Sequence, residues 1–112
     1  MTRKLLFVCM ANINRSPSFQ RFFEKKYPKY QVKSAGIYYG YPDVLNDELL
    51  KWADKVYVMD LEQEIFIAKH YPDCLNKVEV IGVSDQYNPD DDKLIEIIEY
   101  WISKKLRNSE VI

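Results

Sequence analysis

Short apolar runs alternate along this chain with longer segments whose apolar residues recur at helical spacing. The first run, over residues 4–8, lacks polar alternation, which is typical of a strand buried on both faces of a parallel sheet. The pattern predicts strands over 4–8, 30–34, 55–59 and 77–81 and helices over 16–27, 47–53, 61–71 and 93–106. Ser16 and Asn46 are predicted to cap the first two helices, and Asp91 or Asp92 the last one.

This alternation also limits the fold class and the position of a binding site. Strands that alternate with helices of this length are joined by right-handed crossovers and form a parallel sheet covered on both faces. We therefore predict an α/β three-layer sandwich with a four-stranded parallel sheet, formed as a single domain of residues 1–112. Ligands bind at the carboxyl ends of the strands in such sheets. Cys9 and Asp85 each follow a predicted strand, so both are expected at one site.

Charge and cysteine content exclude several classes of function. With 16 Lys and Arg against 17 Asp and Glu, the net charge is −1, which gives no positive field to hold nucleic acid or an anionic membrane. The apolar run after Lys4 is too short for an export signal, which favours a cytoplasmic protein. Cys9 and Cys74 are expected to be thiols. With the single His70 they form no metal-binding pattern, so neither a metal nor another cofactor is expected.

The segment from Cys9 to Ser16 places a thiol, an arginine and a hydroxyl between a buried strand and the start of a helix. Unpaired N–H groups at a helix start, together with the positive end of the helix dipole, favour a bound dianion. We therefore predict a phosphate-binding loop. Its residues are Met10, Ala11, Asn12, Ile13, Asn14, Arg15 and Ser16.

The same segment supplies groups that can break a phosphate ester. A helix N-terminus and a neighbouring arginine favour the thiolate form of cysteine, so Cys9 is the predicted nucleophile. The planar guanidinium of Arg15 can hold two phosphoryl oxygens, and Asp85 is the candidate general acid for the leaving oxygen. Two structural alternatives stay open. Cys9 can be a buried core residue at a strand end, and Asp85 can be one carboxylate of a solvated acidic loop.

Tyrosines gather near both predicted loops. Tyr38 and Tyr39 follow the second predicted strand, and Tyr87 lies close to Asp85. These side chains can line a slot for an aromatic substrate, or they can simply pack on their neighbours. The sequence leaves both interpretations open.

The motif from Leu5 to Cys9, followed by Asn12, Ile13 and the triplet 15–17, resembles the phosphate loop of the low-molecular-weight protein tyrosine phosphatases. The likeness continues at residues 34–36, 52–60 and 83–87, in the order of the family along nearly the whole chain. It implies a metal-independent enzyme that hydrolyses phosphotyrosine-type substrates through a phosphocysteine intermediate.

The resemblance also implies roles for single residues. Cys9 is the nucleophile, Arg15 the phosphate-binding arginine and Asp85 the general acid. Asn12 shapes the loop, and Ser16 supports the thiolate through its hydroxyl. The implied substrates are phosphorylated proteins or small aryl phosphates.

Several positions depart from the family pattern. Many members have glycine where Ala11 stands and a second cysteine where Asn14 stands, so their protective disulfide cannot form here. Ser84 and Gln86 replace prolines on either side of Asp85. Ile13 stands where phosphoarginine-type members tend to carry threonine, which favours phosphotyrosine. The chain is also shorter than typical members, and it resembles a compact bacterial branch.

Two other functions compete with this interpretation. An arsenate reductase shares the fold and the anion loop but needs further cysteines near the first, and only Cys74 is available. A protein that binds phosphate or a phosphoprotein without turnover is the second alternative, suggested by the altered residues around Asp85.

Overall fold

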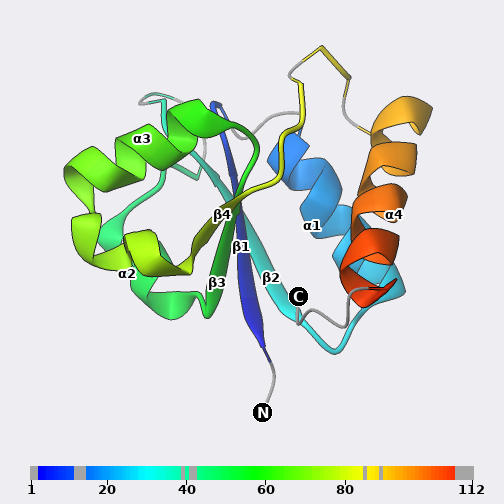
Figure 1. The fold of residues 1–112 in the computed structure, drawn as a ribbon, viewed down its shortest axis with the longest axis horizontal. Helices are drawn as coiled ribbons and strands as arrows, with labels where there is room; N and C mark the ends of the chain where they lie inside the picture. The colour runs from blue at the N-terminus through cyan, green and yellow to red at the C-terminus, as the bar shows by residue number, and fades with distance from the viewer. Residues whose placement is uncertain are drawn as a thin grey trace.

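A computed structural model of the chain shows one parallel sheet with helices on both faces (Figure 1). The structure describes residues 3–11, 15–38, 40, 43–84, 86–88 and 90–107. Residues 106 and 107 are described by their backbone alone. The sheet has the strand order β2-β1-β3-β4, and every neighbouring pair is parallel. The strands are β1 (Lys4–Cys9), β2 (Gln31–Gly36), β3 (Lys55–Val58) and β4 (Val78–Val80).

The central strand β1 divides the core because its side chains alternate between the two faces. Leu5, Phe7 and Cys9 belong to one buried cluster, and Leu6 and Val8 belong to the other. Residues 5–8 have no exposed surface. This is why the first apolar run shows no polar alternation: both of its faces are covered.

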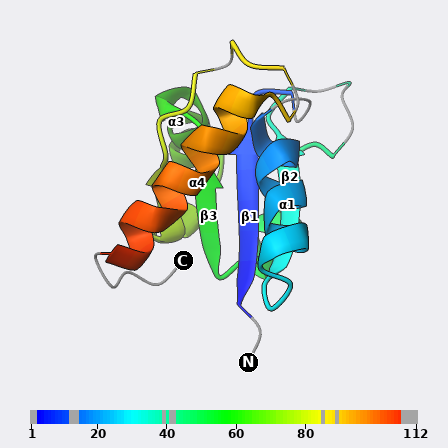
Figure 2. The same cartoon turned by 90° about the vertical axis from the view of Figure 1, so that its right-hand side faces the viewer.

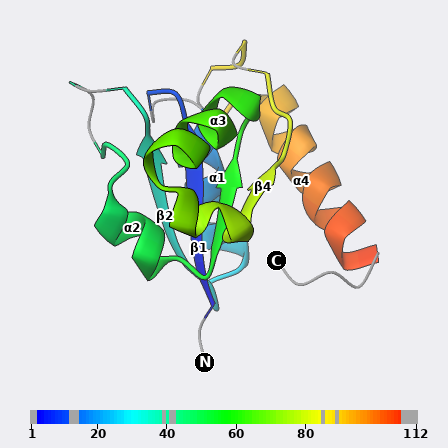
Figure 3. The ribbon, with the colours of Figure 1, turned by 60° about the vertical axis from the view of Figure 1, so that its left-hand side comes forward.

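Two helices cover each face of the sheet. Figure 2 shows α1 (Arg15–Lys26) and α4 (Asp92–Arg107) in front of it. Figure 3 brings forward α2 (Asp47–Trp52) and α3 (Leu61–His70) from the opposite face. A 3-10 helix, η1 (Pro72–Lys77), joins α3 to β4. Within the described part of the chain, no helix is long and apolar enough to cross a membrane.

The predicted fold class is confirmed, and most element boundaries agree to within a few residues. Asn46 caps α2 as predicted, with its side chain accepting the N–H of Leu49 at 2.8 Å. Asp91 accepts the N–H of Lys93 at 2.9 Å and so caps α4. The predicted cap at Ser16 is wrong, because α1 begins one residue earlier, at Arg15, and Ser16 lies buried in its first turn.

Trp101 on α4 is the aromatic contact that binds this helix to the sheet and to α1. Its ring lies 4.8 Å from that of Tyr57 and 5.7 Å from that of Phe19, both edge-on. Replacing it by alanine is expected to lower the free energy of unfolding by about 3–5 kcal/mol, because contacts and buried area are both lost. Chemical denaturation measures the change. Tyr100→Ala is the matched control, since Tyr100 is 69% exposed on the same helix and should change stability by less than about 0.5 kcal/mol.

Candidate active site

The carboxyl ends of the strands meet at one edge of the sheet, and Cys9 lies in the middle of that edge. Cys9 is the last residue of β1, pairs in register with Gly36 of β2, and is only 3% exposed. The carbonyl of the next residue, Met10, accepts the N–H of Ile37 at 2.7 Å and of Tyr38 at 3.0 Å. The backbone that leaves Cys9 is therefore held to the segment that follows β2.

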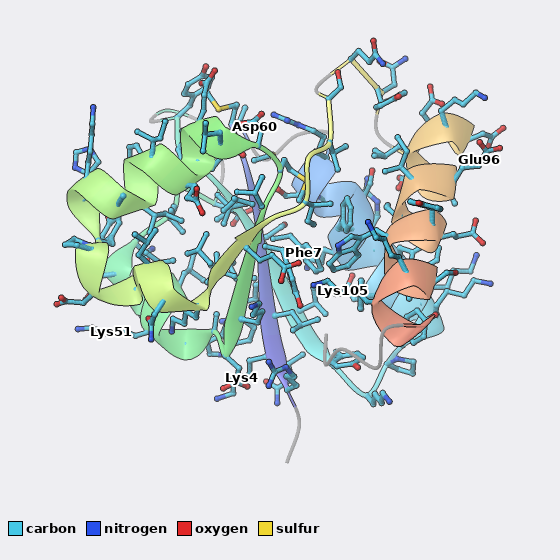
Figure 4. The ribbon with its side chains drawn as sticks, viewed as in Figure 1. Lys4, Phe7, Lys51, Asp60, Glu96 and Lys105 are labelled. Carbon is cyan, nitrogen blue, oxygen red and sulfur yellow. The ribbon has the colours of Figure 1, made fainter. Side chains whose placement is uncertain are left out.

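Arg15, the first residue of α1, ties this edge together. Its side chain is 3% exposed, and Nη1 donates to Oδ2 of Asp60 at 2.9 Å and to the carbonyl of Val83 at 2.8 Å. Asp60 follows β3, and Val83 follows β4. Figure 4 shows Asp60 at the start of α3, beside the carboxyl ends of the strands. Arg15 thus links the segments that follow three strands.

These two bonds use one end of the guanidinium. Both hydrogens of Nη1 are occupied, whereas Nε and Nη2 have no hydrogen-bond partner among the described residues. An arginine carries five N–H donors in a fixed plane. The Nε and Nη2 edge is the one whose parallel N–H groups match two oxygens of a phosphate.

Asp60 is itself held in place by the first turn of α3. Its Oδ1 accepts the N–H of Glu62 at 3.0 Å, while its own N–H donates to Oε1 of the fully buried Gln63 at 2.7 Å. This reciprocal arrangement is a capping box. One carboxylate oxygen caps the helix and the other binds Arg15. No role was predicted for Asp60 from the sequence, although its position after a predicted strand and three residues before a glutamine indicates a capping box.

The remaining residues of the predicted phosphate loop are only partly described. Met10 and Ala11 are half-buried, and Ser16 is fully buried with an Oγ that has no hydrogen-bond partner among the described residues. Asn12, Ile13, Asn14 and Asp85 lie outside the described residues. The structure therefore brings Cys9, Arg15 and Ser16 to the same edge.

The tyrosines proposed for a substrate slot follow the two outermost strands of the sheet, β2 and β4. Tyr38 follows β2 and is 48% exposed, whereas Tyr87 follows β4 and packs partly buried against the α1 and α4 core. Tyr39 lies outside the described residues. Because β1 and β3 lie between β2 and β4, Tyr38 and Tyr87 are placed on two sides of the edge that holds Cys9.

Comparison with known proteins gives both a relative and several similar structures. The chain is 31% identical to the low molecular weight protein-tyrosine-phosphatase Ptp of Acinetobacter johnsonii, over 71% of this chain and 72% of that protein. The tyrosine phosphatase Wzb of Escherichia coli K30, solved with phosphate, has a TM-score of 0.78 at 19% identity and covers 96% of this chain and 99% of its own. The arginine phosphatase YwlE of Geobacillus stearothermophilus has a TM-score of 0.73 at 22% identity and covers 96% and 94%. No protein-family model matches the chain.

Proposed function

Because the chain belongs to the low molecular weight protein-tyrosine-phosphatase family, we propose that it is a cysteine-dependent phosphomonoester hydrolase that needs no metal. Its substrates are phosphotyrosine-type groups, on a phosphorylated protein or a small aryl phosphate, and it acts in the cytoplasm. The observation that carries the proposal is the Nε and Nη2 edge of Arg15, which has no hydrogen-bond partner among the described residues and lies at the carboxyl edge of the sheet where β1 ends in Cys9. That edge matches the geometry of two phosphoryl oxygens.

The reaction begins with attack of the Cys9 thiolate on phosphorus. A phosphorus–sulfur bond forms as the bond to the leaving oxygen breaks, and Asp85 donates the proton that makes this oxygen a neutral alcohol. Arg15 holds two of the equatorial oxygens as charge spreads over them in the transition state. Backbone N–H groups of the loop from Met10 to Ser16 bind the same phosphate.

Hydrolysis of the phosphocysteine completes the cycle. Asp85, now a carboxylate, takes a proton from the attacking water, whose oxygen bonds to phosphorus while the sulfur leaves as thiolate. Ser16 supports this thiolate: its buried Oγ has no hydrogen-bond partner among the described residues, so its proton is available for the sulfur. Inorganic phosphate then dissociates, and the enzyme is restored.

We propose that the tyrosines form the walls of a slot for the aryl ring of the substrate. Tyr38 and Tyr87 come from the two sides of the edge, and Tyr39 adjoins the first of them. A ring between such walls gains from aromatic packing. The depth of this slot would favour phosphotyrosine over shorter phosphorylated side chains.

Hydrolysis of p-nitrophenyl phosphate in EDTA is the direct test of the function. The wild-type protein should release p-nitrophenol at mildly acidic to neutral pH with the same rate whether EDTA is present or absent, because no step uses a metal. Absence of turnover, with phosphate or vanadate still bound in calorimetry, would instead identify a protein that binds phosphorylated partners without hydrolysing them.

Asp85→Asn tests the general acid. The expected loss of kcat/KM is about 10²-fold for phenyl phosphate and smaller for p-nitrophenyl phosphate, because phenolate is the poorer leaving group and depends more on protonation. Steady-state kinetics on both substrates measures the two losses. Asp91→Asn is the control: Asp91 lies six positions after Asp85 and caps a helix, so its replacement should change kcat/KM by the same factor for both substrates. An equal loss for both substrates in Asp85→Asn would exclude the acid role.

A further inference from the structure

The loop between β4 and α4, which carries Asp85, is attached to α1 at both of its ends. At the first end the carbonyl of Val83 accepts Nη1 of Arg15 at 2.8 Å. At the second end the backbone N–H of Asp90 donates to Oγ of Ser18 at 2.9 Å. The carboxylate of Asp90 accepts Nε of Arg21 at 2.9 Å and its Nη2 at 2.8 Å. Figure 2 shows this loop passing above the N-terminal end of α1 before α4 begins.

The burial of Ser18 and the backbone conformation of Asp90 indicate that the attachment at Asp90 is a specific contact. Ser18 is fully buried, so its hydroxyl is held in place where it accepts the Asp90 N–H. Asp90 has a φ of 57°, in the left-handed region that a non-glycine residue rarely adopts. Local contacts maintain this conformation: those with Ser18 and Arg21, and a turn in which the N–H of Asp91 donates to the carbonyl of Asn88 at 3.2 Å. Arg15, Ser18 and Arg21 follow each other at intervals of three along α1, which brings them to one side of the helix.

The ion pair of Arg21 with Asp90 is too exposed to stabilise the fold appreciably, so a contribution to stability does not account for it. The two side chains are 48% and 49% exposed, and pairs with this exposure contribute little to folding. Between its two ends the loop has contacts of its own: Tyr87 packs partly buried against the core, and the N–H of Gln86 donates to Oγ of Ser84 at 3.4 Å. The attachments at its two ends add to these contacts in positioning the loop.

We propose that Asp90 is a positioning residue that, through Ser18 and Arg21, sets where the loop presents the general acid. The proposal rests on the proposed function, in which Asp85 protonates the leaving oxygen. A proton donor must lie within hydrogen-bond reach of the oxygen that leaves. Releasing one end of the loop lengthens the average distance from donor to oxygen while leaving Cys9 and Arg15 in place. The defect should therefore appear in the protonation step alone.

The test compares kcat/KM for phenyl phosphate and p-nitrophenyl phosphate in Asp90→Asn, Arg21→Gln and the double variant. Asparagine tolerates the left-handed backbone, so Asp90→Asn removes the charge without new strain. Each single variant should lose about tenfold on phenyl phosphate and less than about twofold on p-nitrophenyl phosphate, a fraction of what a general acid supplies. The double variant should lose no more than either single one, because both remove the same pair. Arg21→Lys, which keeps the charge, should recover part of the loss.

Lys51→Gln is the matched control. Lys51 pairs with Asp47 at 2.8 Å on α2, on the opposite face of the sheet, where Figure 4 labels it, and both side chains are exposed. The hydrogen bond and the charge of Asp47 raise the pKa of Lys51, as in an intact surface pair. Removing this pair should leave kcat/KM unchanged for both substrates. Thermal unfolding of every variant verifies that it is folded at the assay temperature.

The outcomes separate this proposal from the function on which it rests. Equal losses on both substrates, or none, in the Asp90 and Arg21 variants would overturn the positioning role while Asp85→Asn still shows its selective loss. If Asp85→Asn shows no selective loss, the general acid is elsewhere and the positioning role falls with it. If Cys9→Ser retains activity, the proposed function itself is wrong.

Discussion

Cys9→Ser should abolish hydrolysis of p-nitrophenyl phosphate, with kcat falling by at least about 10⁴-fold, because a serine hydroxyl at this position is not ionised and attacks phosphorus poorly. Cys9 is 3% exposed, and the exchange of sulfur for oxygen changes little of its volume. The variant should therefore fold as the wild type does. Single-turnover measurements with enzyme in excess would detect the residual rate. Vanadate or phosphate binding should remain, since the backbone N–H groups and Arg15 are unchanged.

Cys74→Ser is the matched control for that result. Cys74 is the other thiol of the chain, it is also buried, and it lies in the core cluster on the opposite face of the sheet from Cys9. Its replacement should leave phosphatase activity within about twofold, as expected for a residue away from the chemistry. An essential Cys74 would favour a reductase, in which a second thiol must take part in disulfide formation.

Arg15→Lys should lower kcat/KM for p-nitrophenyl phosphate by about 10³-fold, comparable to the loss of a transition-state arginine in other phosphoryl transfers. Lysine keeps the positive charge but is a point donor, so it cannot satisfy Asp60 and Val83 and also present two parallel N–H groups to phosphate. Calorimetric titration with phosphate separates the loss of ground-state binding from the further loss in the transition state.

Because Arg15 is buried and hydrogen-bonded, Arg15→Lys can also lower the stability of the protein, and a control variant must separate this effect from the loss of phosphate binding. Asp60→Asn keeps one oxygen, which can still accept Nη1 of Arg15, while it removes the negative charge beside the arginine and the second acceptor, used by the N–H of Glu62. It should retain much more activity than Arg15→Lys if the Nε and Nη2 edge of the guanidinium is what binds the phosphate. Activity of Arg15→Lys within a few-fold of wild type would contradict the assignment of Arg15 to the phosphate.

The architecture could be predicted from sequence because a strand that is buried on both faces of the sheet has a recognisable local pattern of apolar residues. The run in β1 is apolar throughout, and the Asn46 cap lies directly before α2, so each signal lies within a few residues. The contacts of Arg15 could not be predicted in this way. They join residues 45 and 68 positions apart, and they depend on β3 rather than β4 lying next to β1. Strand order follows from packing of the whole sheet, which no single segment encodes.

Smaller differences have local causes. The predicted helix start at Ser16 assumed that a serine before a proline acts as a cap, yet here the helix has already begun at Arg15 and the serine is buried. Residues 72–77, for which no helix was predicted, form a 3-10 helix, because Pro72 fits the first position of a helical turn. Neither change moves the strands or the edge at which the site lies.

The bonds of Arg15 to Asp60 and Val83 have a consequence for how the enzyme is made. During synthesis the strand that ends in Cys9 leaves the ribosome long before residue 83 does, so a nascent chain that carries its thiol still lacks the carbonyl that orients the arginine. The catalytic pocket is therefore one of the last features to mature, and a shortened chain that stops before β4 would be inert. In the folded protein the same contacts link anion binding to folding. An anion bound to this arginine therefore stabilises the whole domain against unfolding by mass action.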